Sequence, residues 1–421
     1  MPDASTQHEI IHDAPDFRIR HNFGSDRSVC IITFDSLTDT PDLNRPAFAE
    51  AFLLQHGIDA IHVVNRTNIW YGYEDFEAAL ERVADVAKRY DRVFTYGSSM
   101  GGYAAIRWAQ SVGARTAIAI SPQYSVSKRL TPFEHRWRAI VGDVSRIQNE
   151  PIHGSMSVSP IVFYDPHDLD ALHYELIVRN YPGAVGVAMP NAGHPAGAML
   201  SETGMLSKTI LSIVDGTFDP KDVSNALRAR RRLSGQYLFT LARRVNISQP
   251  RVKQALASAA VRASRDGAYL LYAGIVAERY GDSQTCENRL EEALAVLGDH
   301  PVVLRALAAF SIRHGRAARA LDYANRLCAV DPQPRYRRLQ AVAYAVSGRL
   351  SEARDTMSSR RSDLVLRLSF SPALVTTLPR KLLVWWWARA YRIEAEFDLA
   401  DGWRERKRMR KQLAARNGIF R

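Results

Sequence analysis

Cysteine is scarce in this sequence. The chain of 421 residues holds three cysteines, Cys30, Cys286 and Cys328, which lie far apart. Their odd number and wide spacing argue against a disulfide framework, and no pair has the separation of a structural zinc site. We therefore expect buried thiols in a reducing cytoplasm, and we expect neither a bound metal nor a cofactor.

Long apolar runs are missing as well. No stretch approaches the roughly 20 apolar residues that a membrane-spanning helix needs. The first thirty residues mix Asp, Glu, His and Arg, which is not the pattern of a cleaved secretory signal. Together these absences predict a cytoplasmic protein without a transmembrane segment.

Negative charge is rare in the second half of the chain. Residues 1–220 contain 18 Lys+Arg and 26 Asp+Glu, so their net charge is −8, whereas residues 221–421 contain 38 and 18, which gives +20. The chain is also too long for one ordinary domain. We expect a boundary near residue 220 and an anionic or protein partner for the basic half, although solvated Arg on helix surfaces would give the same composition.

The first half alternates apolar runs with helical stretches. Helical periodicity marks residues 74–90 and 103–112, and residues 122–158 interrupt the rhythm as a possible insertion over a site. The expected buried strands are residues 28–34, 60–65, 92–96, 116–120, 160–164 and 184–189. This alternation predicts an α/β fold with a mostly parallel sheet and helices on both faces.

The second half lacks strand signals and is expected to be all helical. Gly281, Gly315 and Gly348 recur at steps of 34 and 33 residues, so residues 267–366 resemble the tetratricopeptide repeat (TPR), a helix-turn-helix unit of about 34 residues. We expect an α/β domain over 1–220, a helical linker over 221–266 and a TPR-like domain over 267–421. Irregular helices with coincidental glycines remain the alternative.

Two segments of the second half suggest other partners. Residues 382–393 contain three consecutive tryptophans beside a basic tail, which fits either a buried cap of the repeats or peripheral contact with a membrane. Residues 241–256 resemble a DNA-binding helix-turn-helix with Arg251 and Lys253 exposed on its second helix. We favour an ordinary helix N-cap at Ser248 and do not expect nucleic acid as a partner.

A Gly-x-Ser-x-Gly pattern carries the chemistry of the first half. Gly97, Ser99 and Gly101 follow the strand RVFTY and precede a helix rich in small residues. A sharp strand-to-helix turn lifts the serine oxygen above a sheet, and the glycines remove side chains that would clash in that turn. Ser99 is therefore the predicted nucleophile.

A serine nucleophile needs a base and an acid that orients the base. His194 lies among small residues directly after the last strand and is the expected base. Three carboxylates follow the strand 160–164: we expect Asp168 to be the acid, Asp165 is its rival, and Asp170 is the least favoured of the three.

With these motifs, residues 25–215 resemble the α/β-hydrolase superfamily. The resemblance implies attack of Ser99 on an acyl carbonyl, proton transfer by His194, and an oxyanion hole with the backbone N–H of Met100 as one donor. It places the second donor in the loop after the early strand, where Asp35 replaces the common His-Gly pattern. An acidic side chain there would oppose an oxyanion unless it pointed away.

The loop after the second strand is the expected substrate wall. Asn68, Trp70 and Tyr71 place amides and aromatic rings at the carboxyl end of a strand, which suits a small-molecule or glycan acyl ester; simple packing of the two rings into the core is equally compatible. The sequence thus predicts a serine esterase, with acyl transfer as a related reaction. The alternative is a non-catalytic scaffold that binds through its basic helices.

Overall fold

A computed structural model describes residues 8–142, 144–246 and 248–357, together with residues 370, 382 and 383. The chain forms two compact units, Met1–Thr240 and Leu241–Arg421. The division thus lies about twenty residues beyond the boundary expected from charge. The reason is helix α9 (Pro220–Arg230), which buries Val223 and Leu227 in the core of the first unit.

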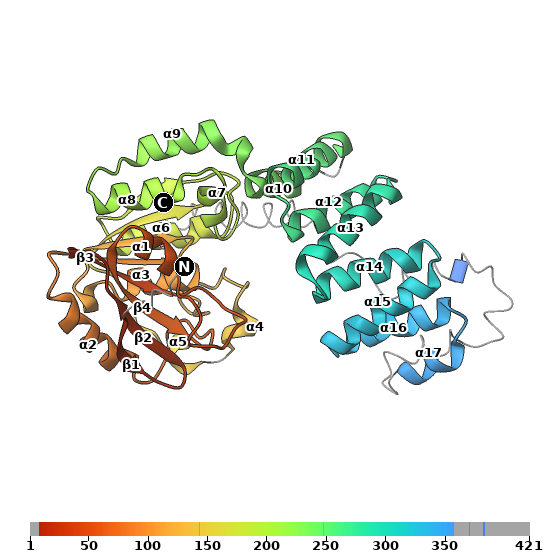
Figure 1. Ribbon diagram of the computed structural model, residues 1–421, viewed down its shortest axis with the longest axis horizontal. Helices are drawn as coiled ribbons and strands as arrows, with labels where there is room; N and C mark the ends of the chain where they lie inside the picture. Colours follow the sequence, from red (N-terminus) through yellow and green to blue (C-terminus); the bar gives the residue numbers. More distant parts are fainter. Residues whose placement is uncertain (1–7, 143, 247, 358–369, 371–381, 384–421) are drawn as a thin grey trace, which may run out of the picture. The chain divides into compact units, whose positions relative to one another are not determined.

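The first unit is built on one eight-stranded sheet (Figure 1). Its strand order is β1-β2-β4-β3-β5-β6-β7-β8, with β3 to β8 parallel and β1 and β2 antiparallel. The strands are β1 (His8–Asp13), β2 (Phe17–Asn22), β3 (Asp26–Phe34), β4 (Ile58–Asn65), β5 (Arg92–Ser98), β6 (Thr116–Ile120), β7 (Ser159–Tyr164) and β8 (Val185–Ala188). This sheet confirms the predicted α/β fold class with a mostly parallel sheet.

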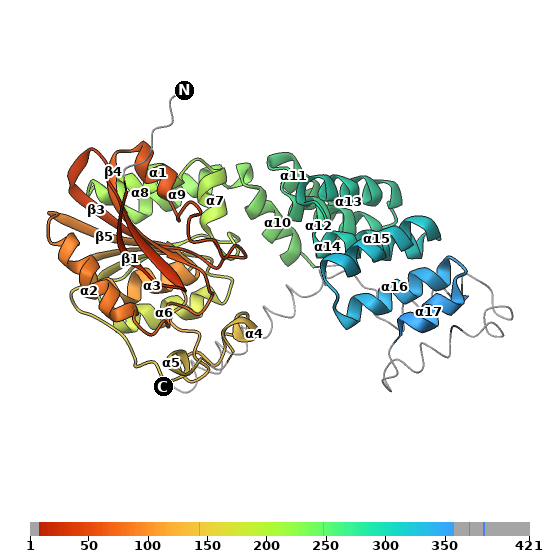
Figure 2. The ribbon, with the colours of Figure 1, turned by 60° about the horizontal axis from the view of Figure 1, so that its bottom comes forward.

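Helices cover both faces of the sheet and bury one apolar core on each side (Figure 2). One core contains side chains from α2 (Phe76–Ala87), α3 (Met100–Arg107) and α6 (Asp170–Asn180). The other contains side chains from α1 (Glu50–Gln55), α7 (Gly197–Glu202), α8 (Leu206–Val214) and α9. The parallel strands are therefore buried on both faces, which explains why their sequences are nearly continuous apolar runs.

The expected interruption at residues 122–158 lies between β6 and β7. Its described regular structure consists of two short helices, α4 (Arg138–Val141) and α5 (Ser145–Gln148). The remainder is held by buried polar side chains, among them Glu134, Glu150 and His153. This segment contributes side chains to the edge of the sheet where the parallel strands end.

The second unit is helical in its described part. After α10 (Gly235–Arg244), which crosses the boundary between the units, and α11 (Pro250–Ala263), the helices pack in pairs: α12 (Gly267–Arg279) with α13 (Ser283–Leu297), α14 (Pro301–Arg313) with α15 (Ala317–Val330), and α16 (Pro334–Val346) with α17 (Leu350–Thr356). Gly281, Gly315 and Gly348 occupy the turn within each pair at φ of 88°, 69° and 85°. Glycine adopts this left-handed conformation readily, which accounts for the spacing. The assignment to the TPR class stays a prediction.

The structure contradicts one expectation for the second unit, and the other falls largely outside the described residues. Lys253 is not on a DNA-facing surface: it is 0% exposed, and its ammonium donates to Ala242 O at 2.7 Å and to the Tyr272 hydroxyl at 3.1 Å. The helix-turn-helix interpretation therefore loses one of its two basic contacts. The tryptophan-rich segment 382–393 lies outside the described residues except for Leu382 and Leu383. Among the described helices, none has the length and apolar character needed to cross a membrane.

Candidate active site

Ser99 stands in a strained turn between β5 and α3. Its φ is 52° and its ψ is −116°, a backbone conformation that non-glycine residues rarely adopt. Glycines make the turn possible: a Cβ at Gly97 would lie 2.2 Å from Gly101 O, and one at Gly101 would lie 2.1 Å from Phe34 O. The turn lifts Ser99 to the edge where the parallel strands end, and the residue is 7% exposed.

Ser99 belongs to a chain of hydrogen bonds between three side chains. Its Oγ lies 2.9 Å from Nε2 of His194. The other ring nitrogen of His194, Nδ1, lies 3.0 Å from both carboxylate oxygens of Asp170. This nitrogen must carry the hydrogen because a carboxylate only accepts, which leaves Nε2 free to accept a proton from Ser99.

The carboxylate at His194 differs from the two that the sequence favoured. Asp168 Oδ1 instead accepts from the guanidinium of Arg136 at 3.1 Å and from the backbone N–H of Leu169. Asp165 accepts backbone N–H groups of His167, Asn191 and Gly193, at 2.9, 3.2 and 2.8 Å. Asp170, the least favoured residue, begins α6 and points back to the imidazole.

Asp165 holds the loop that carries His194. Its two carboxylate oxygens connect the end of β7 to the loop that carries His194. On the far side of that loop, Gln236 from α10 donates to Ala192 O at 3.0 Å. Gly193 has a φ of 71°, and a Cβ there would lie 2.8 Å from the Gln236 amide nitrogen. The loop is therefore held from both sides.

Asp170 is ionised by its surroundings. Burial alone would raise its pKa, but His194 and Arg136 outweigh that effect and hold the pKa of Asp170 well below its usual range. Arg136 Nη1 donates to Asp170 at 3.0 Å, and its Nη2 donates to Glu134 at 2.7 Å. By contrast, burial and the neighbouring Asp170 charge raise the pKa of Asp168.

Arg136 is placed by residues that the sequence did not single out. Glu134 accepts hydrogen bonds from the Arg136 guanidinium. Glu134 is in turn held by His173, whose Nε2 lies 2.9 Å from Glu134 Oε2. The other ring nitrogen of His173 accepts the backbone N–H of Tyr124 at 3.1 Å. Because Glu134 and Arg136 belong to the 122–158 segment, this segment helps to determine which carboxylate meets His194.

The backbone N–H groups of Met100 and Asp35, the two oxyanion donors that the resemblance implies, have different surroundings. Met100 begins α3, where the first N–H groups have no partner within the helix. The Asp35 N–H, however, donates to Val63 O at 3.3 Å and is thus occupied. The Asp35 side chain points away to Arg45 at 2.5 Å and to the Phe48 N–H at 2.7 Å. Burial raises the pKa of Asp35 to about 6, against the opposing effects of Phe48 and Arg45.

The expected substrate wall is packed inside the protein. Trp70 and Tyr71 are each 1% exposed and belong to the core on the α2 and α3 side. The Tyr71 hydroxyl donates to Asp35 O at 2.7 Å, and Asn68 exchanges hydrogen bonds with the backbone of Thr38. These residues brace the loop after β3 and do not present an open face, so the packing interpretation describes both rings.

Two other residues, Trp137 and Gln123 of the 122–158 segment, lie close to His194 and Ser99. The Trp137 ring is 5.5 Å from the His194 ring, and its Nε1 has no hydrogen-bond partner among the described residues. The Gln123 side chain lies near Ser99, with its Nε2 3.5 Å from Ser99 Oγ. Sequence reasoning recognised the segment as an insertion over the site, but its bulky residues carry no spacing that identifies particular contacts.

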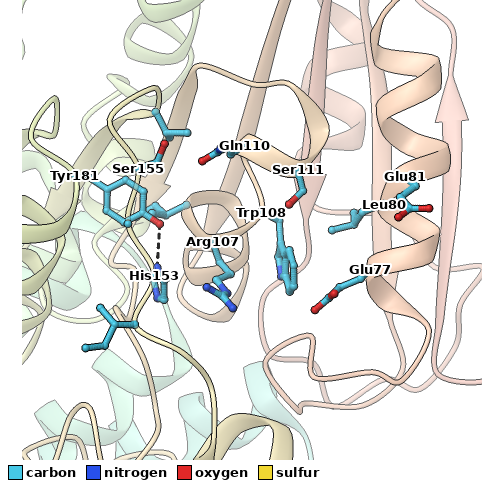
Figure 3. Close-up of a pocket in the computed structure, with 14 residues that line it drawn as sticks. Glu77, Leu80, Glu81, Arg107, Trp108, Gln110, Ser111, His153, Ser155 and Tyr181 are labelled. Atoms are coloured by element: carbon cyan, nitrogen blue, oxygen red, sulfur yellow. Dashed lines mark hydrogen bonds between the residues drawn. The ribbon is translucent and has the colours of Figure 1, made fainter.

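A separate hollow of about 600 Å³ lies at the other end of α3 (Figure 3). Arg107, Trp108, His153 and Tyr181 line it. His153 Nδ1 lies 2.9 Å from the Tyr181 hydroxyl, within hydrogen-bond distance. None of the described residues that line it belongs to the group of Ser99, His194 and Asp170. Acidic residues from α2 line the same hollow as Arg107, so its charge indicates no ligand class. Within the described part of the chain, no group of three or more His, Cys, Asp or Glu side chains is arranged to hold a metal ion.

Comparisons with known proteins give distant structural likenesses. The sequence matches no family model, and no curated protein matches it. A capsule O-acetyltransferase of Neisseria meningitidis serogroup A is similar over 48% of this chain and 93% of its own, with 10% identity and a TM-score of 0.35. A Pyrococcus furiosus esterase is similar over 50% and 92%, with 13% identity and a TM-score of 0.35. MGS-M1, an α/β-hydrolase enzyme from a Medee basin deep-sea metagenome library, is similar over 53% and 99%, with 13% identity and a TM-score of 0.34. Identities this low transfer no activity to this chain.

Proposed function

We propose that the first unit is a serine hydrolase that cleaves carboxylic acyl esters, with Ser99 as nucleophile, His194 as general base and acid, and Asp170 as the orienting carboxylate. The continuous hydrogen-bonded path from Ser99 Oγ through the imidazole to the buried carboxylate carries this proposal. The strained turn supports it, because backbone strain of this kind is characteristic of functional sites.

The geometry supports an acyl-enzyme mechanism. His194 Nε2 takes the proton of Ser99 as Oγ attacks the ester carbonyl, and Asp170 stabilises the imidazolium that forms. Return of that proton to the alcohol oxygen allows the leaving group to depart. Water then repeats the sequence on the acyl-enzyme, or a second alcohol does so in an acyl transfer. Asp170 remains ionised throughout because its pKa lies well below its usual range.

The class of alcohol is left open in this proposal. The sequence suits a small-molecule or glycan acyl ester through Asn68, Trp70 and Tyr71, but both rings are buried and Asn68 is bonded to the backbone of Thr38, which removes the argument for a glycan. Trp137, beside His194, is the aromatic residue that a substrate would meet. A panel of esters that differ in acyl length and alcohol, acetylated sugars included, would define the substrate.

The direct test is covalent labelling with a fluorophosphonate probe. Wild-type protein should become labelled at Ser99, and Ser99→Ala should not react at all. Heat-unfolded wild type is the control, because labelling must require the folded site. Strong labelling of Ser99→Ala would overturn the assignment of the nucleophile, and no labelling of folded wild type would favour the scaffold alternative.

We also propose that the second unit recruits an acidic polypeptide partner. The residues of this unit, 241–421, contain 33 Lys+Arg and 17 Asp+Glu and so carry a net charge of +16, and acidic side chains such as Glu278 and Asp299 are already paired with Arg313 and Arg326. Full-length protein should therefore bind polyglutamate in a manner that weakens steeply with salt. Retention that does not change with salt would contradict this role.

A further inference from the structure

Gln123 is a buried amide whose hydrogen-bond donors are poorly used. It follows β6 and is 1% exposed. Its Nε2 makes only two contacts among the described residues, with Ser99 Oγ and with Ser121 O, and both are 3.5 Å long. Bonds of this length are at the limit of a hydrogen bond, and a buried donor without a good partner lowers stability. A group of this kind next to a nucleophile calls for a functional explanation.

The orientation of this amide is set by Trp70. The indole Nε1 of Trp70 lies 3.1 Å from Gln123 Oε1, and an indole nitrogen can only donate. The amide oxygen must therefore face Trp70, which turns the NH₂ group toward Ser99. Trp70 and Tyr71 have positive φ angles of 49° and 58°, so the strained backbone of this loop serves to direct the two side chains inward.

In the proposed reaction, the Asp35 N–H is not available as the second oxyanion donor that the resemblance implies. The carbonyl oxygen of the ester gains negative charge when Ser99 attacks, and preorganised donors that stabilise this charge contribute strongly to catalysis. Met100 N–H is one such donor, whereas the N–H of Asp35 is occupied by Val63 O. Side-chain amides of Asn and Gln fill this role in some serine hydrolases.

We propose that the Gln123 amide is the second oxyanion donor, and that Trp70 is the positioning residue that holds it. This inference rests on the proposed function. As the bond between Ser99 Oγ and the acyl carbon forms, the carbonyl π electrons move to oxygen and the Ser99 proton passes to His194. Gln123 Nε2–H and Met100 N–H donate to that oxygen. When the carbonyl re-forms, the bond to the alcohol breaks and His194 protonates the departing oxygen.

Substitution of Gln123 by Met tests the donor, because Met has a similar length and no N–H. With p-nitrophenyl acetate, Gln123→Met should lower kcat about 10²–10³-fold and leave KM within about twofold. Trp70→Phe keeps an aromatic ring but removes the indole N–H, and it should lower kcat about tenfold. Because both variants act through one donor, the double variant should be no slower than Gln123→Met alone.

Controls separate this inference from its foundation. Gln123→Met should still be labelled to completion by a fluorophosphonate at a reduced rate, which shows that Ser99 and His194 remain intact. A kcat of Gln123→Met within twofold of wild type would overturn the role of Gln123 while leaving the hydrolase assignment untouched. Absence of labelling in wild type would instead remove the hydrolase assignment. If Gln123→Met does not fold, Trp70→Phe tests the proposal in its place. An unchanged kcat with a lowered Tm would mean that both residues contribute to stability and not to catalysis.

Discussion

The turn between β5 and α3 and the loop between β7 and α6 reach the same edge of the sheet, yet different forces fix their side chains. In the first, the backbone alone places Ser99, since Gly97 and Gly101 allow contacts that a Cβ would block. In the second, three carboxylates compete within six residues, and Arg136 from a distant segment contacts two of them. Local sequence therefore determines where Ser99 lies, whereas tertiary contacts determine which carboxylate meets His194.

The largest effect is expected at the turn itself. Gly101→Ala would place a Cβ 2.1 Å from a backbone oxygen of β3, which cannot move without disturbing the sheet. We expect a loss of roughly 3 kcal/mol or more in the free energy of unfolding and no fluorophosphonate labelling. Urea denaturation measures the first quantity.

Gly197→Ala is the matched control for this substitution. Gly197 begins α7, and the nearest atom to an added Cβ is a side-chain carbon of Ile120 at 3.6 Å. The change in unfolding free energy should stay within about 1 kcal/mol. Equal urea midpoints for the two variants would mean that the backbone does not fix the turn.

The next effect separates the carboxylates of the β7–α6 loop. Asp170→Asn should lower kcat for p-nitrophenyl acetate by about 10³–10⁴-fold, because the amide no longer stabilises the imidazolium or selects the required tautomer. Asp168→Asn is the control, since Asp168 accepts a hydrogen bond from Arg136 at 3.1 Å, whereas it is Asp170 that lies 3.0 Å from His194 Nδ1. We expect it to retain at least about a tenth of the activity. The reverse order of the two variants would restore Asp168 as the acid.

The same contrast explains which parts of the site could be predicted from the sequence. Ser99 and His194 are recognisable because their neighbours in the chain form the turn and the narrow loop. Strands β1 and β2 were missed because their sequences, HEIIHD and FRIRHN, contain many polar residues. Asp170 could not be selected because its partner Arg136 lies 34 residues earlier and is placed by Glu134.

The aromatic loop shows a second kind of limit. Trp70 and Tyr71 follow a strand, as residues that contact a substrate often do, and composition cannot reveal that the backbone turns both rings inward. Gln123 carried no signal in the sequence because its importance depends on a hydrogen bond donated by Trp70, 53 residues away. The fold class and the turn at Ser99 can be predicted from local sequence, but contacts across the sheet edge cannot.

An intermediate effect is expected at Asp165. This carboxylate accepts the backbone N–H groups of Asn191 and Gly193, which belong to the loop that carries His194. Asp165→Asn turns an NH₂ group toward one of these donors, so kcat should fall about 10- to 100-fold and Tm should fall as well. A loss as large as that of Asp170→Asn, with Tm unchanged, would mean that Asp165 acts in the chemistry.

The smallest effect concerns pH and the segment that carries Arg136. His153, in that segment, lies 2.6 Å from Tyr124 O and 2.9 Å from the Tyr181 hydroxyl. Burial lowers the pKa of His153 to about 3, and the charge of Arg107 acts in the same direction. The unfolded chain takes up this proton near pH 6.5, so it binds more protons than the folded state between these values.

Stability should therefore fall as the pH falls below 6.5. For this one imidazole, the decrease between pH 6.5 and 5.5 is about 1 kcal/mol. His153→Gln can keep both hydrogen bonds but does not titrate. From pH 6.5 to 5.5, the unfolding free energy of this variant should therefore decrease by about 1 kcal/mol less than that of wild type, as measured by urea titrations at the two pH values. Parallel declines in the two proteins would show that His153 does not link this segment to pH.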